Sequence, residues 1–174
     1  MLKNNYLRYA STLAIICLAA SGFSGVVFNL TRPKIPDQYS TEEKRSLREV
    51  FPRAYSFEPV QEGDKILYFK ALDRKKNVLG FVFETSRRGY SSDIVTMAGM
   101  DKNGMITRIK ILSQNETPGV GSRITEGFQE QFSDKKADEV SGSVNAITGA
   151  TISSRAVIDS IQAKAREILE KVRR

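Results

Sequence analysis

The first feature of the hydropathy pattern is an uncharged run near the start of the 174-residue chain, from residue 9 to residue 31. Its length of about 23 residues is close to the ~20 that a helix needs to cross a bilayer. Lys3 and Arg8 precede the run, which predicts a cytoplasmic N-terminus. We therefore predict one transmembrane helix in the cytoplasmic (inner) membrane, with the remainder of the chain on the periplasmic or extracellular face.

A cleaved signal peptide is the alternative interpretation of this run, because residues 19–21 are small enough for a cleavage site. A retained anchor is favoured because apolar side chains continue to Phe28, well past that site. Residues 32–40 contain two prolines and are predicted to form a linker. The predicted organisation is an anchor at 1–31, a linker at 32–40 and an extracytoplasmic domain at 41–174.

The domain begins with helical periodicity and then changes to alternation. Ser40 or Thr41, with acidic residues after it, predicts a short helix that ends before Pro52. Alternating apolar positions then predict a meander of four antiparallel strands, with a hairpin turn at Asn103-Gly104. The predicted strands are 65–72, 78–85, 93–100 and 105–112.

The C-terminal third is predicted to be loops and helices. Pro118 with two nearby glycines predicts an irregular loop at 114–121, and apolar residues four apart predict one short helix at 122–132. A short strand near Glu139-Val140 is a weaker expectation. An apolar face of 3.6-residue period predicts a last helix, Ser153–Val172, that covers the sheet. The fold class is therefore α+β, with an antiparallel sheet packed by helices.

Composition and charge restrict the chemistry. The chain has no His and one Cys, which disfavours zinc, haem and iron–sulfur centres because these are built mostly from such ligands. Any redox chemistry would then need an organic cofactor. The net charge of +7 is spread along the chain with no basic stripe among aromatics, so nucleic-acid binding is not expected.

Residues 143–154 are the stretch with candidate chemistry. Thr151 is predicted to lie on a loop just before the last helix, with Ser153 and Ser154 as helix caps. Free N–H groups and the helix dipole favour an anion at such a place, so a phosphodiester on Thr151 would suit it. The alternative is a plain turn that leads into a capped helix. Tyr90 is either an ordinary loop tyrosine or a neighbour of a bound ring.

Two motifs together resemble a known family. Residues 148–154 resemble the flavinylation motif of the FMN-binding domain family, and residues 116–121 resemble its second signature loop. The order of anchor, meander and these two loops is also similar, and the likeness covers roughly residues 7–172. Within the family, the chain most resembles the G subunits of Rnf-type electron transport complexes and the related C subunits of the sodium-pumping NADH:quinone reductase.

The resemblance implies FMN joined covalently through its phosphate to the Thr151 hydroxyl by a separate flavin transferase. One position departs from the motif, because Asn145 stands where the motif has Asp, six residues before the modified threonine. The positions that carry over are Thr148, Gly149 and Ala150, for transferase recognition and close approach, and Glu116, Thr117, Pro118, Gly119 and Gly121, for the loop that lines the flavin.

The resemblance further implies an electron-relay subunit that works with the other membrane subunits of an Rnf-type ion-translocating complex and has no complete catalytic activity alone. Two alternatives remain open. One is a scaffold subunit whose flavin site is vestigial because of Asn145, and the other is a stand-alone membrane-anchored flavoprotein. Thr151→Ala separates the first alternative from the relay, and co-purifying subunits separate the second.

Overall fold

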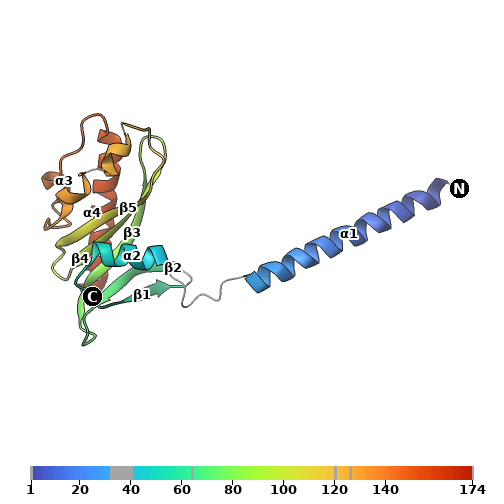
Figure 1. The fold of residues 1–174 in the computed structure, drawn as a ribbon, viewed down its shortest axis with the longest axis horizontal. Coiled ribbons are helices and arrows are strands. Elements are labelled where there is room, and N and C mark those ends of the chain that lie inside the picture. The colour runs from blue at the N-terminus through green and yellow to red at the C-terminus, as the bar shows by residue number, and fades with distance from the viewer. Residues whose placement is uncertain (1, 32–40, 64, 120, 126, 174) are drawn as a thin grey trace. The chain divides into compact units, whose positions relative to one another are not determined.

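The computed structural model describes residues 2–31, 41–63, 65–119, 121–125 and 127–173. The chain divides into two compact units, Met1–Ser40 and Thr41–Arg174. The first contains helix α1 (Leu2–Thr31), in which the side chains from Tyr9 to Ser24 are exposed (Figure 1). No helix within the described residues is both long enough and apolar enough to span a membrane. The predicted linker at 32–40 lies outside the described residues.

The second unit is built on one antiparallel sheet in which every strand pairs with the next along the chain, in the order β1-β2-β3-β4-β5 (Figure 1). This confirms the predicted meander and adds a fifth strand, β1, at its edge. The strands are β1 (Ser56–Glu62), β2 (Lys65–Leu72), β3 (Val78–Arg88), β4 (Asp93–Asp101) and β5 (Ile106–Ser113).

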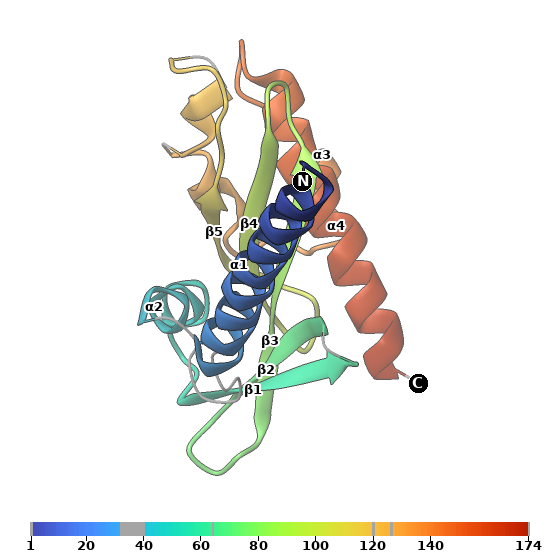
Figure 2. The ribbon, with the colours of Figure 1, turned by 90° about the vertical axis from the view of Figure 1, so that its right-hand side faces the viewer.

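One helix covers each face of the sheet, with α2 (Thr41–Val50) on one side and α4 (Thr151–Arg173) on the other (Figure 2). Alternate residues of a strand point to opposite faces, so Phe81 and Phe83 join the larger core under α4. Gly99 lies under the end of α2, where a Cβ atom would come within 2.6 Å of the Val50 carbonyl oxygen. A glycine is therefore needed where helix and strand backbones approach most closely.

The segment between β5 and α4 differs from the prediction. Instead of one helix at 122–132, two 3₁₀ turns form, η1 (Gly121–Thr125) and η2 (Gln129–Phe132). Gly127 between them has a φ of +68°, which a continuous right-handed helix cannot contain. The expected strand near Glu139-Val140 is instead part of a helical turn, α3 (Val140–Ser143).

Candidate functional site

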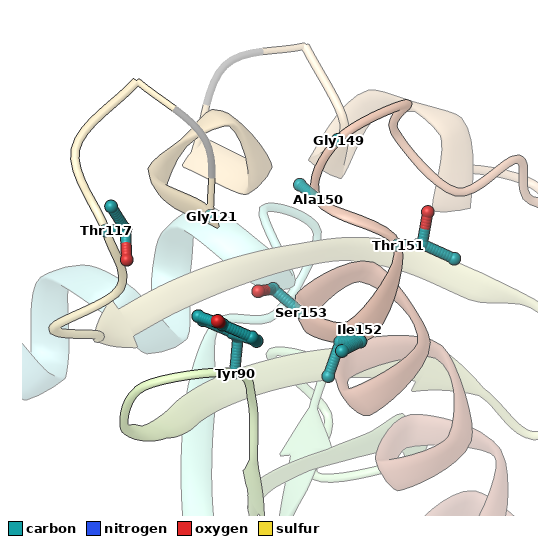
Figure 3. A pocket seen from close by; sticks show the side chains of 8 residues that line it. All are labelled: Tyr90, Thr117, Gly121, Gly149, Ala150, Thr151, Ile152 and Ser153. Atoms are coloured by element: carbon teal, nitrogen blue, oxygen red, sulfur yellow. The ribbon is translucent and has the colours of Figure 1, made fainter.

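A cavity of about 450 Å³ lies at one end of the sheet, where three segments distant in sequence meet (Figure 3). The segments are the β3–β4 loop, the loop after β5 and the start of α4. The volume falls within the range of small-molecule sites in proteins. The lining residues are Tyr90, Thr117, Gly121, Gly149, Ala150, Thr151, Ile152 and Ser153.

The start of α4 has a defined local geometry. Gly149 has a φ of +85°, which lets the chain reverse, and the Ala150 carbonyl then accepts the first helical hydrogen bond from the Ser154 N–H at 2.8 Å. The Ser154 hydroxyl accepts a hydrogen bond from the Ile147 N–H at 3.1 Å. This second bond closes the turn that precedes the helix.

The predicted start of this helix, at Ser153, was wrong by two residues. Thr151 is the first residue of α4 and does not lie on a loop before it. Ser153 and Ser154 are buried within the first turn and do not cap the helix. Their hydroxyls contact the loops around the cavity, which explains why polar side chains occur at these buried positions.

Thr151 lies on the rim of the cavity and its side chain is exposed. Figure 3 shows this side chain directed away from Tyr90 and Ser153, so the hydroxyl is accessible from outside. The first turn of α4 contains no acidic side chain. The positive end of the helix dipole therefore faces the region around Thr151 without a carboxylate in that turn to offset it.

Glu116 is buried behind the cavity wall, with 5% of its surface exposed. Its carboxylate accepts a hydrogen bond from the Ser153 hydroxyl at 2.5 Å. It also accepts backbone N–H bonds from Ser92 and Ser91 at 3.0 Å and from Tyr90 at 3.2 Å. Burial raises the pKa of Glu116, but these hydrogen bonds together outweigh it and hold the pKa below its ordinary value.

The structure brings together most of the residues predicted from the two motifs. Thr117, Gly121, Gly149, Ala150 and Thr151 line the cavity. The predicted residues elsewhere are Glu116, which lies behind Ser153, and Thr148, Pro118 and Gly119, which are exposed nearby.

Sequence reasoning missed two residues of the cavity wall, Ile152 and Ser153, and left Tyr90 undecided. Tyr90 lines the cavity with its side chain 68% exposed. The signal for Ile152 and Ser153 was their place next to Thr151, because the first turn of a helix presents successive residues around its end. Asn145 is exposed, and its backbone N–H donates to the Gln131 side chain at 3.0 Å.

The family model described as "FMN-binding domain" matches residues 89–165, which include every residue that lines the cavity. The model described as "RnfG N-terminal region" matches residues 1–50. Two curated relatives are named as the G subunits of ion-translocating oxidoreductase complexes. The one from Methanosarcina acetivorans is 33% identical over 164 residues, covering 86% of this chain and 87% of the relative.

The second relative, from Pasteurella multocida, is 30% identical over 189 residues. The alignment covers 94% of this chain and 94% of the relative. The chain therefore belongs to the family of G subunits of ion-translocating oxidoreductase complexes. The crystal structure of Shewanella oneidensis NqrC is similar to the chain with a TM-score of 0.50 and 18% identity, covering 70% of this chain and 74% of NqrC. This likeness concerns the fold alone.

Proposed function

We propose that this chain is the electron-relay subunit of a membrane ion-translocating oxidoreductase complex of the Rnf type and that it carries FMN on Thr151. The observation that carries the proposal is the cavity of the FMN-binding domain, with an exposed threonine hydroxyl on its rim at the start of α4. Family membership supports the role of the chain as one subunit among several.

The residues of the cavity fit a flavin. Tyr90 and Ile152 provide apolar surface for a planar ring, and Gly149, where a Cβ atom would meet nothing within 4 Å, lets a ring approach the backbone closely. Bound FMN supplies the electron transfer that the side chains themselves do not. The described lining residues include no carboxylate and no Lys or Arg side chain. A relay of electrons needs no general base, because protons on a flavin exchange with water.

A covalent link would serve a domain outside the cytoplasm. A cofactor held only by affinity is lost by dilution, whereas a phosphodiester at Thr151 removes the need for tight binding. The residues of the wall then only have to orient the ring. The exposed hydroxyl of Thr151 leaves room for a flavin transferase to act on the folded domain.

Intact-mass measurement of protein made in cells that contain the transferase tests the attachment. The wild type is expected to carry one FMN phosphoryl adduct, and Thr151→Ala is expected to lack it. Thr125→Ala is the matched control, because Thr125 is also exposed but does not line the cavity. An unmodified wild-type mass, or an adduct that persists in Thr151→Ala, would contradict the proposal.

We further propose that α1 anchors the chain in the membrane with the FMN-binding domain outside the cytoplasm. The support is the uncharged run at 9–31 with Lys3 and Arg8 before it. The expected result is that the full chain stays with membranes after alkaline carbonate extraction. Leu18→Lys is expected to weaken insertion, because a central Lys costs about 3 kcal/mol in a spanning helix. Extraction of the wild type would refute the anchor.

A scaffold role with a vestigial flavin site remains the second candidate, and Asn145 is the observation that favours it. Under that role, Thr151→Ala leaves both assembly of the complex and electron flux intact. Under the relay proposal, assembly is retained and flux is lost. Asn145→Asp, which restores the carboxylate of the motif, is expected to raise the modified fraction if the transferase needs that charge.

A further inference from the structure

We propose that Glu116 is the positioning residue of the flavin site, which holds the cavity walls in place before FMN is attached and lowers the reduction potential of the flavin afterwards. The inference rests on the proposed function. It differs from the role implied by the motif, in which Glu116 lines the flavin, because in the structure its carboxylate lies behind Ser153.

The first step of the argument is that one carboxylate connects all three segments of the site. Glu116 belongs to the loop after β5, its Oε2 binds Ser153 of α4, and both oxygens bind the β3–β4 loop. Each connected segment contributes a lining residue, which is Tyr90, Ser153 or Gly121 (Figure 3). Two further hydrogen bonds join the loops on their exposed side. The buried connection between the walls therefore runs through this carboxylate.

The second step is that the surroundings are shaped to enclose this carboxylate. A Cβ atom at Gly89 would come within 2.7 Å of Glu116 Oε1, and one at Gly121 would come within 2.7 Å of Oε2. Both glycines therefore leave space that the carboxylate fills. This space lets backbone N–H groups and the Ser153 hydroxyl come within hydrogen-bond distance of the two carboxylate oxygens of Glu116.

The third step is that the site requires the ionised form. Three backbone N–H groups and two hydroxyls, those of Ser153 and Ser92, donate to the carboxylate, and an ionised carboxylate offers only acceptors to them. A protonated acid or an amide would place a hydrogen against one of these donors. The hydrogen bonds also lower the pKa of Glu116 despite its burial, so the charge is present at neutral pH.

The fourth step links the charge to the flavin. Ser153 lines the cavity, and its hydroxyl is 2.5 Å from Glu116, so a negative charge lies one side chain behind the wall. FMN held in this cavity would gain negative charge on its ring when it accepts an electron from a reduced partner subunit. A fixed anion nearby opposes this addition, because like charges interact strongly where little water intervenes. The charge of Glu116 would therefore make the bound flavin a stronger reductant toward the acceptor subunit.

Hydrogen exchange on protein without flavin tests the positioning. In the Thr151→Ala background of the full chain, the amides of residues 90–92 are expected to be protected. Adding Glu116→Gln is expected to speed their exchange about tenfold, the effect of losing one hydrogen bond of ordinary strength. Asp93→Asn is the matched control, because Asp93 is an exposed carboxylate beside the same loop. Unchanged exchange in Glu116→Gln would overturn the positioning role.

Redox titration of the flavin-loaded full chain with dithionite tests the charge. Glu116→Gln is expected to raise the midpoint potential, and Asp93→Asn to leave it near the wild-type value. Ser153→Ala keeps the charge but removes a donor that offsets it, so the expected shift is downward. Opposite shifts distinguish an electrostatic role from general disorder of the site. A potential that is unchanged or lower in Glu116→Gln would overturn this part.

The two experiments separate this inference from the proposed function. If the wild type carries no FMN, the proposed function fails, while hydrogen exchange still decides whether Glu116 fixes the loops. If Glu116→Gln does not fold, Ser153→Ala in the same two measurements decides the question. The inference would be contradicted if Ser153→Ala changed neither the amide exchange of residues 90–92 nor the midpoint potential of the flavin.

Discussion

At the scale of single residues, Gly121 leaves little room for a side chain. A Cβ atom there would lie 2.7 Å from the Cβ and Oε2 of Glu116. We expect Gly121→Ala to lower the free energy of unfolding by about 1–3 kcal/mol, the usual cost of overpacking. Gly142→Ala is the control, because a Cβ at Gly142 meets nothing within 4 Å. Urea unfolding followed by circular dichroism measures both, and equal midpoints would show that the loop yields without cost.

The second residue-scale prediction concerns the stability of the domain in acid. A carboxyl whose pKa is lowered on folding stabilises the fold above its unfolded pKa, and this stabilisation is lost as the pH falls through the lowered value. Glu116 has such a lowered pKa, so wild type is expected to exceed Glu116→Gln by about 1–3 kcal/mol at pH 7. In urea titrations, the gap should shrink as the pH falls below the ordinary pKa of a glutamic acid and through the lowered pKa of Glu116. A gap that is constant with pH would mean that the ionised form gives no extra stability.

At the scale of elements, α4 contributes a row of fully buried side chains to the core. Ile161 is fully buried in this row, whereas Val172 near the end of the helix is 45% exposed. Ile161→Ala is expected to cost about 2–5 kcal/mol through lost burial and a cavity, and Val172→Ala less than about 1 kcal/mol. Thermal unfolding of the two variants compares them. If both variants lost a similar amount of unfolding free energy, burial of Ile161 would not be what holds the helix on the sheet, and the contacts of its first turn would be the main ones.

Strong periodicity made most elements predictable, and its absence explains those that were missed. β2 to β5 and α4 have apolar positions at regular spacing, so the sequence located them to within a few residues. β1 was missed because it contains Pro59 and has polar residues on both faces, as an edge strand can. The break at Gly127 was also missed, because the apolar spacing of Ile124, Phe128 and Phe132 continues across it.

At the scale of the whole molecule, the described core side chains all lie between Leu47 and Ile168, within the second compact unit. Removal of residues 1–40 is therefore expected to leave the unfolding midpoint of the remaining domain unchanged. The deletion should also retain the capacity for FMN attachment where the transferase has access to it. Comparison of the full chain in detergent with the truncated protein in the same detergent checks this, and a lowered midpoint would show that the domain depends on α1.

The site itself was only partly readable from the sequence. The loop at 116–121 and the stretch around Thr151 were located by their resemblance to two family motifs, because the local sequence alone is equally compatible with a plain turn before a helix. The β3–β4 loop lines the cavity because the meander places it at the same end of the sheet as the other two segments. No motif in the loop itself indicates this. The role of Glu116 likewise depends on donors that are 24 to 37 residues away in sequence.

The antiparallel order of the sheet also separates its two ends. The turn between β2 and β3 lies at the opposite end from the cavity, with Arg74, Lys75 and Lys76 exposed on it. Asp73 closes this turn together with backbone hydrogen bonds, because its side chain accepts N–H bonds from Lys75 and Asn77 at 2.7 and 2.8 Å. Exposed turns of this kind accept added sequence well. An epitope tag or a small reporter inserted after Arg74 would replace the local contacts of Asp73 and mark the protein in cells at a distance from the cavity.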